Sequence, residues 1–129
     1  MTETLQSVLI LLVLFQIKHM FADYFLQTPR MLTGRSDYLH VGRAQHAGVH
    51  AIGSIPVLAI VGTPAGALIA LIIAEWVVHF HIDWGKARYS EAKGYSPADA
   101  GFWRAAGFDQ ALHQLTYVAM VWAWLEVAV

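Results

Sequence analysis

The hydrophobic pattern divides the chain into four long apolar segments separated by polar or glycine-rich connections. These segments cover about residues 5–26, 45–61, 67–85 and 108–127. Each has roughly the length that a helix needs to cross a bilayer, about 17 to 25 residues. None shows the strict apolar and polar alternation that is typical of a half-buried strand. The pattern predicts an all-α fold, a four-transmembrane-helix up-down bundle, with residues 1–129 as a single integral membrane domain.

Glycine, proline and capping residues predict how the spans are connected. Residues 62–66 read Gly-Thr-Pro-Ala-Gly and predict a short turn between the second and third spans. Before the fourth span, Ser96 followed by Pro97 is typical of a helix start. Because the aromatic residues Phe102 and Trp103 follow, we expect a short interfacial helix between helices 3 and 4.

Positive charges are concentrated in two of the connections. They are Arg30, Arg35 and Arg43 in the first, and Lys86, Arg88, Lys93 and Arg104 in the third. The positive-inside rule places both connections in the cytoplasm and both termini outside it. The first positive residue, Lys18, lies well inside the first span, so we expect a retained span rather than a cleavable signal. We therefore predict a multi-pass protein of the bacterial inner membrane.

Composition excludes several classes of function. Hydrophobic residues make up 57% of the chain and charged residues 13%, far from the roughly 25% charged content of soluble domains. The formal net charge is -1 and no dense basic run occurs, so we expect no nucleic-acid partner. The chain has no cysteine, which leaves imidazole and oxygen as the only metal ligands.

Each predicted span carries two ionisable residues four positions apart, a spacing that places both on one face of a helix. The pairs are His19 and Asp23, His46 and His50, His79 and Asp83, and Asp109 and His113. With odd spans running toward the cytoplasm and even spans away from it, all four pairs fall near the cytoplasmic end. We expect a deeper layer and a shallower one. The deeper layer holds His19, His50, His79 and His113, and the shallower layer holds Asp23, His46, Asp83 and Asp109.

A shared site of this kind favours metal binding over isolated polar contacts. Ionisable groups inside a membrane are costly and usually functional, and three acids do not neutralise so many histidines. We expect one or two divalent ions, zinc, iron or manganese. Either a carboxylate bridges two ions, or one ion binds imidazoles whose orientation the aspartates fix. A proton-handling or structural polar network is the second interpretation, and haem the third.

The candidate residues also have predicted roles in catalysis. Asp23, Asp83 and Asp109 are the candidate catalytic groups, as bridging, orienting or general-base carboxylates. Substrate-binding candidates are the loop cations Arg30, Arg43, Lys86 and Arg88. Residues 79–83 spell the H-x-H-x-D of strand-borne metallo-hydrolases, but on a helix His81 points about 200° away from His79. We interpret that match as chance.

Three motifs together resemble a known family. They are residues 19–28 (HMFADYFLQT), His79 with Asp83 and Lys86, and residues 109–113 (DQALH). In order and spacing they are similar to the small bacterial membrane proteins of the domain of unknown function 3307 family, and the likeness covers nearly the whole chain. The setting of His and Asp in membrane helices is also loosely similar to inner-membrane metal-dependent hydrolases.

The leading functional hypothesis is a metal-dependent hydrolase at the cytoplasmic face that acts on a phosphate ester of a lipid or other amphiphile. The alternative is an ion- or proton-handling or metal-sensing membrane subunit without catalysis, and the third is a haem-binding membrane protein. Membrane lipid is the expected partner. Gly48, Gly53, Gly62 and Gly66 offer close-approach surfaces, so we also expect a homo-oligomer.

Overall fold

The computed structural model describes residues 2–128, and this part of the chain contains five helices, joined by turns and irregular connections, and no strand. The predicted all-α class is therefore confirmed. The helices are α1 (Glu3–Tyr24), α2 (Pro29–Leu32), α3 (Val41–Ile60), α4 (Ala65–Lys93) and α5 (Ala100–Ala128).

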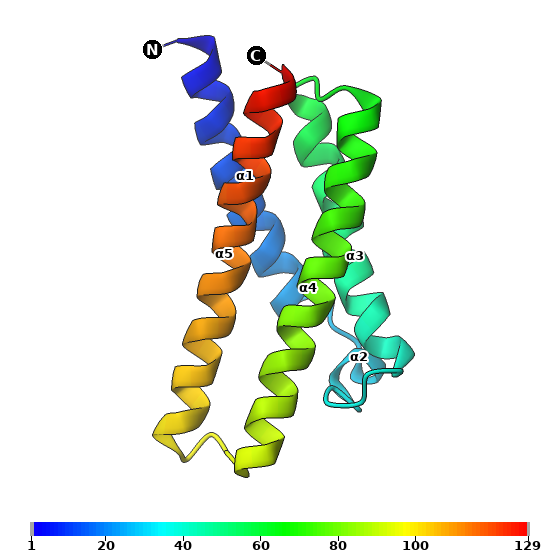
Figure 1. The fold of residues 1–129 in the computed structure, drawn as a ribbon, viewed down its shortest axis with the longest axis vertical. Coiled ribbons are helices and arrows are strands. Elements are labelled where there is room, and N and C mark those ends of the chain that lie inside the picture. The colour runs from blue at the N-terminus through cyan, green and yellow to red at the C-terminus, as the bar shows by residue number, and fades with distance from the viewer. Residues whose placement is uncertain (1, 129) are drawn as a thin grey trace.

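Four of the helices are long and each packs against two others (Figure 1). Helix α1 contacts α3 and α5, and α4 contacts the same two helices. Both ends of the chain and the α3–α4 turn lie at one end of the molecule, whereas α2 and the α4–α5 connection lie at the other (Figure 1). The basic connections predicted from the sequence therefore share one end.

The predicted interfacial helix between the third and fourth spans is wrong. Helix α4 continues to Lys93 and ends at Gly94, whose φ of 64° is left-handed and suits glycine. A turn follows, in which Ser96 donates to Asp99, and α5 then begins at Ala100. Since no proline follows Pro97, nothing interrupts the helix before residue 108, and the expected interfacial segment forms the first turns of α5.

The first connection contains structure that the hydrophobic pattern did not predict. Helix α2 has four residues and begins with Pro29, which suits the first turn of a helix because proline lacks an N–H. Helix α3 starts before its apolar segment, because the His40 side chain accepts a hydrogen bond from the Gly42 N–H and caps it. This early start brings Arg43 into the helix.

The molecule has large apolar side chains on its surface and polar side chains in part of its interior. Many large apolar side chains on the outer faces are exposed, among them Val13, Ile52 and Val118. Nine polar or charged residues are buried, including five histidines and Glu75. Extended apolar surface of this kind marks contact with lipid or a partner rather than with water.

Two of the helices, α1 and α4, are long and apolar enough to cross a membrane. The sequence predicted four such spans. Helices α3 and α5 contain the polar residues His46, His50, Gln110 and His113, which reduce the apolar content of their central turns.

The interior of the molecule has two halves. Toward the chain ends it is an apolar core built from Leu11, Phe15, Leu58, Tyr117 and Trp124 with their neighbours. Toward α2 and the basic connections the interior is polar and contains the histidine and aspartate pairs.

Candidate metal centre

All four long helices contribute side chains to one buried cluster. The members on each helix are one turn apart, so a single face of each helix supplies two groups. Those predicted ligands are His19 and Asp23 on α1, His46 and His50 on α3, His79 and Asp83 on α4, and Asp109 and His113 on α5.

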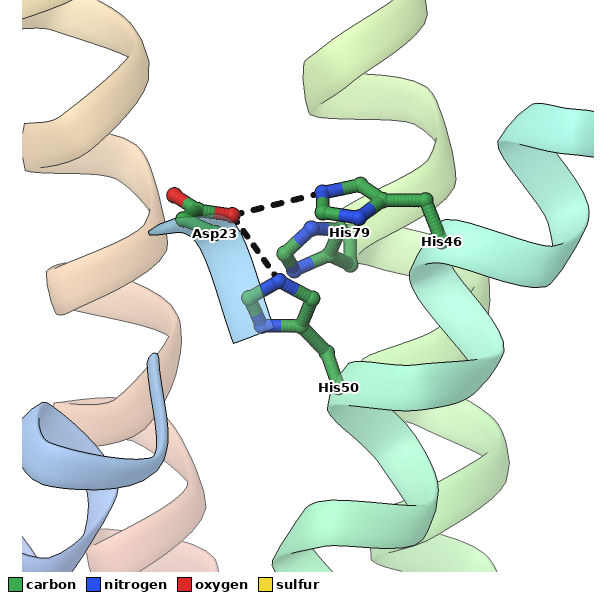
Figure 2. Close-up of side chains that lie close together, drawn as sticks. All are labelled: Asp23, His46, His50 and His79. Carbon is green, nitrogen blue, oxygen red and sulfur yellow. Dashed lines mark hydrogen bonds and ion pairs between the residues drawn. The ribbon is translucent and has the colours of Figure 1, made fainter. Parts of the chain in front are cut away.

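Asp23 is the first of two carboxylates around which the imidazoles gather. Its oxygens lie 3.1 Å from Nε2 of His19, 3.3 Å from Nε2 of His46 and 3.0 Å from Nε2 of His50. Figure 2 shows His46 and His50 pointing from α3 toward Asp23, with His79 beside them. One carboxylate therefore contacts imidazoles from two helices.

Asp83 is the second carboxylate and has a similar environment. Its oxygens lie 3.4 Å from Nε2 of His79, 3.2 Å from Nε2 of His113 and 3.5 Å from Nε2 of His46. Because His46 contacts both Asp23 and Asp83, the two carboxylates belong to one continuous cluster.

The imidazole rings also lie against one another. Ring centroids are 3.8 Å apart for His50 and His79 and 4.1 Å apart for His79 and His113. His46 and His50 are separated by 4.7 Å. The predicted separation into two layers is thus incomplete, since His46 packs directly on a ring of the deeper layer.

Six of the eight predicted ligands form two groups that can hold a metal ion. Asp23, His46, His50 and His79 form one group, and His79, Asp83 and His113 form the other. Within each group the donor atoms lie within 4.8 Å of one another. Two ligands placed roughly 2.0–2.1 Å from zinc at tetrahedral angles are about 3.3 Å apart. The nitrogen–oxygen distances of 3.0 to 3.4 Å around Asp23 and Asp83 fit that spacing.

Four atoms of the cluster are buried without any hydrogen-bond partner among the described residues. They are Nδ1 of His46, Nδ1 of His50, Nε2 of His79 and Oδ1 of Asp109. Buried polar atoms in folded proteins nearly always have a partner. An ion held by the cluster satisfies this requirement at His79, which belongs to both ligand groups.

His19 and Asp109 lie in the cluster but outside both ligand groups. His19 is engaged by Tyr117, whose hydroxyl lies 2.9 Å from Nδ1, and by Gln110, whose Oε1 lies 3.2 Å from Nε2. Asp109 lies 3.6 Å from His113 and accepts a hydrogen bond from the Gln110 amide. These two residues are adjacent to the ligand groups rather than part of them.

The family model described as protein of unknown function (DUF3307) matches residues 10–128. The chain belongs to the DUF3307 family. The resemblance seen in the sequence motifs is therefore confirmed. No curated protein and no solved structure matches this DUF3307 chain. The chemistry of the cluster follows from its geometry alone.

A second polar cluster lies between the candidate metal ligands and the apolar core of this DUF3307 protein. Lys18 forms an ion pair with Glu75 and donates to the Tyr117 hydroxyl, at 2.9 Å, and to the His50 carbonyl, at 3.2 Å. The Lys18 and Glu75 side chains are only 8% and 1% exposed. Through Tyr117 this ion pair is joined to His19.

The site residues predicted from the sequence did not include Lys18 or Tyr117. The sequence nevertheless contains a signal for each of them. Lys18 is a charge inside an apolar span, and Tyr117 follows His113 by four residues, so it shares a face of α5 with the predicted ligands. Glu75 is likewise one turn from His79.

A cavity of about 220 Å³ opens beside the cluster toward the basic connections. Asp23, Asp83 and Asp109 line it together with three cations, Arg35, Arg43 and Lys86. We call this cavity the mouth of the site. Of the predicted substrate-binding residues, Arg43 and Lys86 line the mouth, whereas Arg30 and Arg88 do not. Arg88 instead lies near Glu91 on the exposed face of α4.

Arg43 has unused hydrogen-bonding capacity at the mouth. Its guanidinium is buried and donates through Nη2 to the carbonyls of Gly34 and Asp37. Its Nε and Nη1 are buried and have no hydrogen-bond partner among residues 2–128. A guanidinium presents these donors in a fixed planar fork that matches carboxylate and phosphate oxygens. The mouth therefore combines a guanidinium that is held in place by two carbonyls with a carboxylate and imidazole cluster.

Proposed function

We propose that this DUF3307 protein is a multi-pass protein of the bacterial inner membrane, in which all four long helices cross the bilayer. Helices α1 and α4 have the required length and composition, and α3 and α5 pack beside both. The exposed apolar faces suit lipid, and the buried polar groups satisfy one another inside. The basic connections then lie in the cytoplasm and both termini lie outside it.

We further propose that the cluster binds two divalent ions, each held by two histidines and one aspartate. A neutral imidazole nitrogen binds one ion, so His79, which belongs to both groups, serves only one of them. Assigning it to the second gives Asp23, His46 and His50 for one ion and His79, Asp83 and His113 for the other. Three protein ligands leave a position open for water or substrate. Zinc, iron and manganese all accept such ligands.

The reaction that this arrangement supports best is hydrolysis of a phosphate ester carried by a lipid-like substrate. Its main support is the position of the mouth, where Arg43, with two unpaired donors, and Lys86 line the same cavity as the three aspartates. Divalent ions in paired sites stabilise phosphoryl charge and promote attack by water. The Arg43 guanidinium binds the phosphoryl oxygens and orients the ester.

Asp109 has the environment of a general base in this proposal. It lines the mouth, stands outside both ligand groups and has an oxygen without a partner. Water adds its oxygen to phosphorus as the bond to the alcohol breaks, and Asp109 takes the water proton and passes it to the leaving oxygen. His19 contacts Asp23 and Tyr117, and it orients that carboxylate without touching the substrate.

The proposal is tested by phosphate release from phosphatidic acid in vesicles that contain the purified protein and zinc, iron or manganese. We expect Asp109→Asn to reduce the rate by roughly a hundredfold without changing metal content. Glu91→Gln is the matched control, because Glu91 is an exposed acid on α4, and its rate should be normal. Phosphate release no faster than with the metal alone, for all three ions, would overturn the hydrolase.

Ion or proton handling remains a second candidate function because the polar chain from Asp23 continues through His19 and Tyr117 to Lys18. Among the described residues this chain ends at the apolar core, where Phe15 stacks on Tyr117 at 5.0 Å. Proton flux into liposomes separates the two functions. Flux that is lost in Tyr117→Phe would favour handling of protons, and its absence favours the hydrolase.

A haem is harder to place in this cluster. Two axial imidazoles lie on opposite faces of a porphyrin, whereas the His50 and His79 rings lie against each other, with centroids 3.8 Å apart and an interplanar angle of 34°. The purified protein should accordingly show no Soret band in its visible spectrum.

A further inference from the structure

A second and larger cavity runs along the outside of α4 and α5. It has a volume of about 830 Å³ and is lined only by α4, α5 and their connection. On α4 its lining extends from Val77 to Tyr89, about 18 Å at 1.5 Å per residue. We call this cavity the α4–α5 groove.

The deeper part of the α4–α5 groove is apolar. Val77, Val78 and Ile82 of α4 face Phe108 and Leu112 of α5 across it. Four of these five side chains are exposed by 41% or more. Gly85 stands in the same wall, and a side chain added there would meet no other atom within 4 Å. The groove is therefore open along its length.

The part of the groove near the α4–α5 connection has the character of a membrane interface. Lys86 and Arg104 supply positive charge there, and Tyr89 and Tyr95 lie with their rings 6.0 Å apart. Tyrosines gather at the headgroup level of a bilayer, where their rings are amphipathic. Lysine and arginine at the same depth attract anionic headgroups. The apolar part of the groove thus suits the acyl chain of an anionic lipid, and the basic part suits its headgroup.

The groove adjoins the mouth of the candidate metal centre. Lys86 and Asp109 line both cavities. A molecule that occupies the groove with its charged end at Lys86 therefore has that end next to the three aspartates of the cluster. Such a position lets the substrate reach the cluster sideways from the bilayer without leaving the lipid phase.

We propose that the α4–α5 groove binds one acyl chain of an anionic phospholipid and delivers its phosphate to the mouth between Lys86 and Arg43. This inference rests on the proposed function, because the phospholipid that it names is the substrate of the same site. Binding itself requires only the walls of the groove and the two cations Lys86 and Arg104.

The test uses phosphatidic acid with a photoactivatable group in one acyl chain, mixed into phosphatidylcholine vesicles that contain the full chain and a metal chelator. After illumination, mass spectrometry locates the labelled residues. We expect labelling of Val78, Ile82 and Leu112 to exceed that of Val13 and Ile17 on the outer face of α1. Equal labelling of the two sets would show general lipid contact and overturn the groove.

Matched glycine substitutions test the groove itself. Gly85→Phe fills the groove, and Gly107→Phe places the same side chain on α5 outside the lining residues, where a Cβ also meets nothing within 4 Å. Labelling should fall several-fold in Gly85→Phe and stay normal in Gly107→Phe. Equal labelling in both variants contradicts the proposal. If Gly85→Phe does not fold, the labelling ratio in the unmodified protein decides alone.

A separate labelling experiment tests whether the groove selects anionic headgroups. Lys86→Gln and Arg104→Gln should each reduce labelling by phosphatidic acid about fivefold, since each cation near an anionic surface contributes about 1 kcal/mol. A photoactivatable phosphatidylcholine should show no preference for the groove. If phosphatidylcholine labels the groove as selectively as phosphatidic acid does, the proposal that the bound lipid is anionic is overturned.

The chelator makes this experiment independent of hydrolysis. Groove labelling, combined with no phosphate release in the separate assay with metal, would overturn the hydrolase but leave the lipid site. Phosphate release without groove labelling supports the hydrolase and overturns lateral access through α4 and α5.

Discussion

Each long helix supplies two ionisable side chains to the cluster, four positions apart in the chain. That spacing places both members of a pair on one helix face, and the structure brings together all eight side chains named from it. Distance to a particular partner does not follow from spacing. The spacing alone does not separate His19 and Asp109 from the six residues of the ligand groups, because that separation depends on contacts with Tyr117 and Gln110 from α5. That these residues bind metal stays a prediction.

The buried Lys18–Glu75 ion pair permits a prediction on stability. Lys18→Met leaves the Glu75 carboxylate in an apolar interior, so we expect a loss of about 3–5 kcal/mol in the free energy of unfolding. The double variant Lys18→Met/Glu75→Leu removes both charges and should recover most of that loss. Denaturant unfolding in detergent micelles measures both.

Lys93→Met is the control for that pair, because Lys93 is exposed at the end of α4. It should change stability by no more than a few tenths of a kcal/mol. A double variant that is less stable than Lys18→Met would show that the polar pair itself, rather than its charge balance, supports the fold.

At the scale of helices, hydrophobic segments predicted the existence of α1, α3, α4 and α5 but misplaced several of their ends. Helix α5 begins eight residues before the predicted position of 108, since the residues before Phe108 are helix-compatible although they are not uniformly apolar. Helix α2 escaped prediction because a single turn has no periodicity to detect. Its position depends on a tertiary contact with α3.

That contact between α2 and α3 is tight at Gly42. A Cβ at this position would overlap the backbone carbonyl of Arg30 on α2. We expect Gly42→Ala to displace α2 and to reduce stability by about 1–3 kcal/mol. Because Met31 of α2 and Arg43 both line the mouth, the KM for a phosphate ester should also rise.

Gly48→Ala is the matched control on the same helix, because its added Cβ would lie 3.9 Å from the nearest atom, Nε1 of Trp76. Unfolding and phosphate-release assays on both variants check the prediction. A Gly42→Ala protein as stable and active as Gly48→Ala would show that α2 does not close on α3 as described.

The turn before α5, which lies outside the helices, should depend on pH. The backbone N–H of Ser96, together with its hydroxyl, donates to Asp99 and holds the pKa of that carboxyl below its usual value of 3.8. A carboxyl whose pKa is lowered by folding stabilises the folded state at pH values above its ordinary pKa. This stabilisation disappears as the pH falls through the lowered pKa. The protection factors of amides 98–104, which are exchange rates corrected for the intrinsic dependence on pH, should therefore fall in acid. Asp99→Asn should already exchange faster at neutral pH, and identical rates would contradict the role of this turn.

For the whole molecule, the sequence predicted which end carries the basic connections, and the structure places both connections opposite the chain ends (Figure 1). The side of the membrane on which each end lies is a property of insertion and stays a prediction. The two cavities beside the cluster could not be predicted, because they form between helices whose rotation and separation depend on side-chain packing.

The orientation is testable because the chain has no cysteine of its own. Glu3→Cys and Ala98→Cys introduce single thiols at exposed positions at opposite ends of the molecule. In spheroplasts, a membrane-impermeant maleimide should label the first directly and the second only after permeabilisation. Direct labelling of the second thiol would reverse the orientation, and direct labelling of both would contradict a membrane-spanning arrangement.

Metal content tests the central claim most directly. Elemental analysis of the purified protein should find about two divalent ions per chain, as paired metal sites require. We expect about one ion in His50→Ala and in Asp83→Ala, which each remove a ligand from a different group, and about two in His81→Ala, whose imidazole bonds instead to Tyr38 and the Val77 carbonyl. A chain that carries no metal, or equal metal content in all four proteins, would contradict the site.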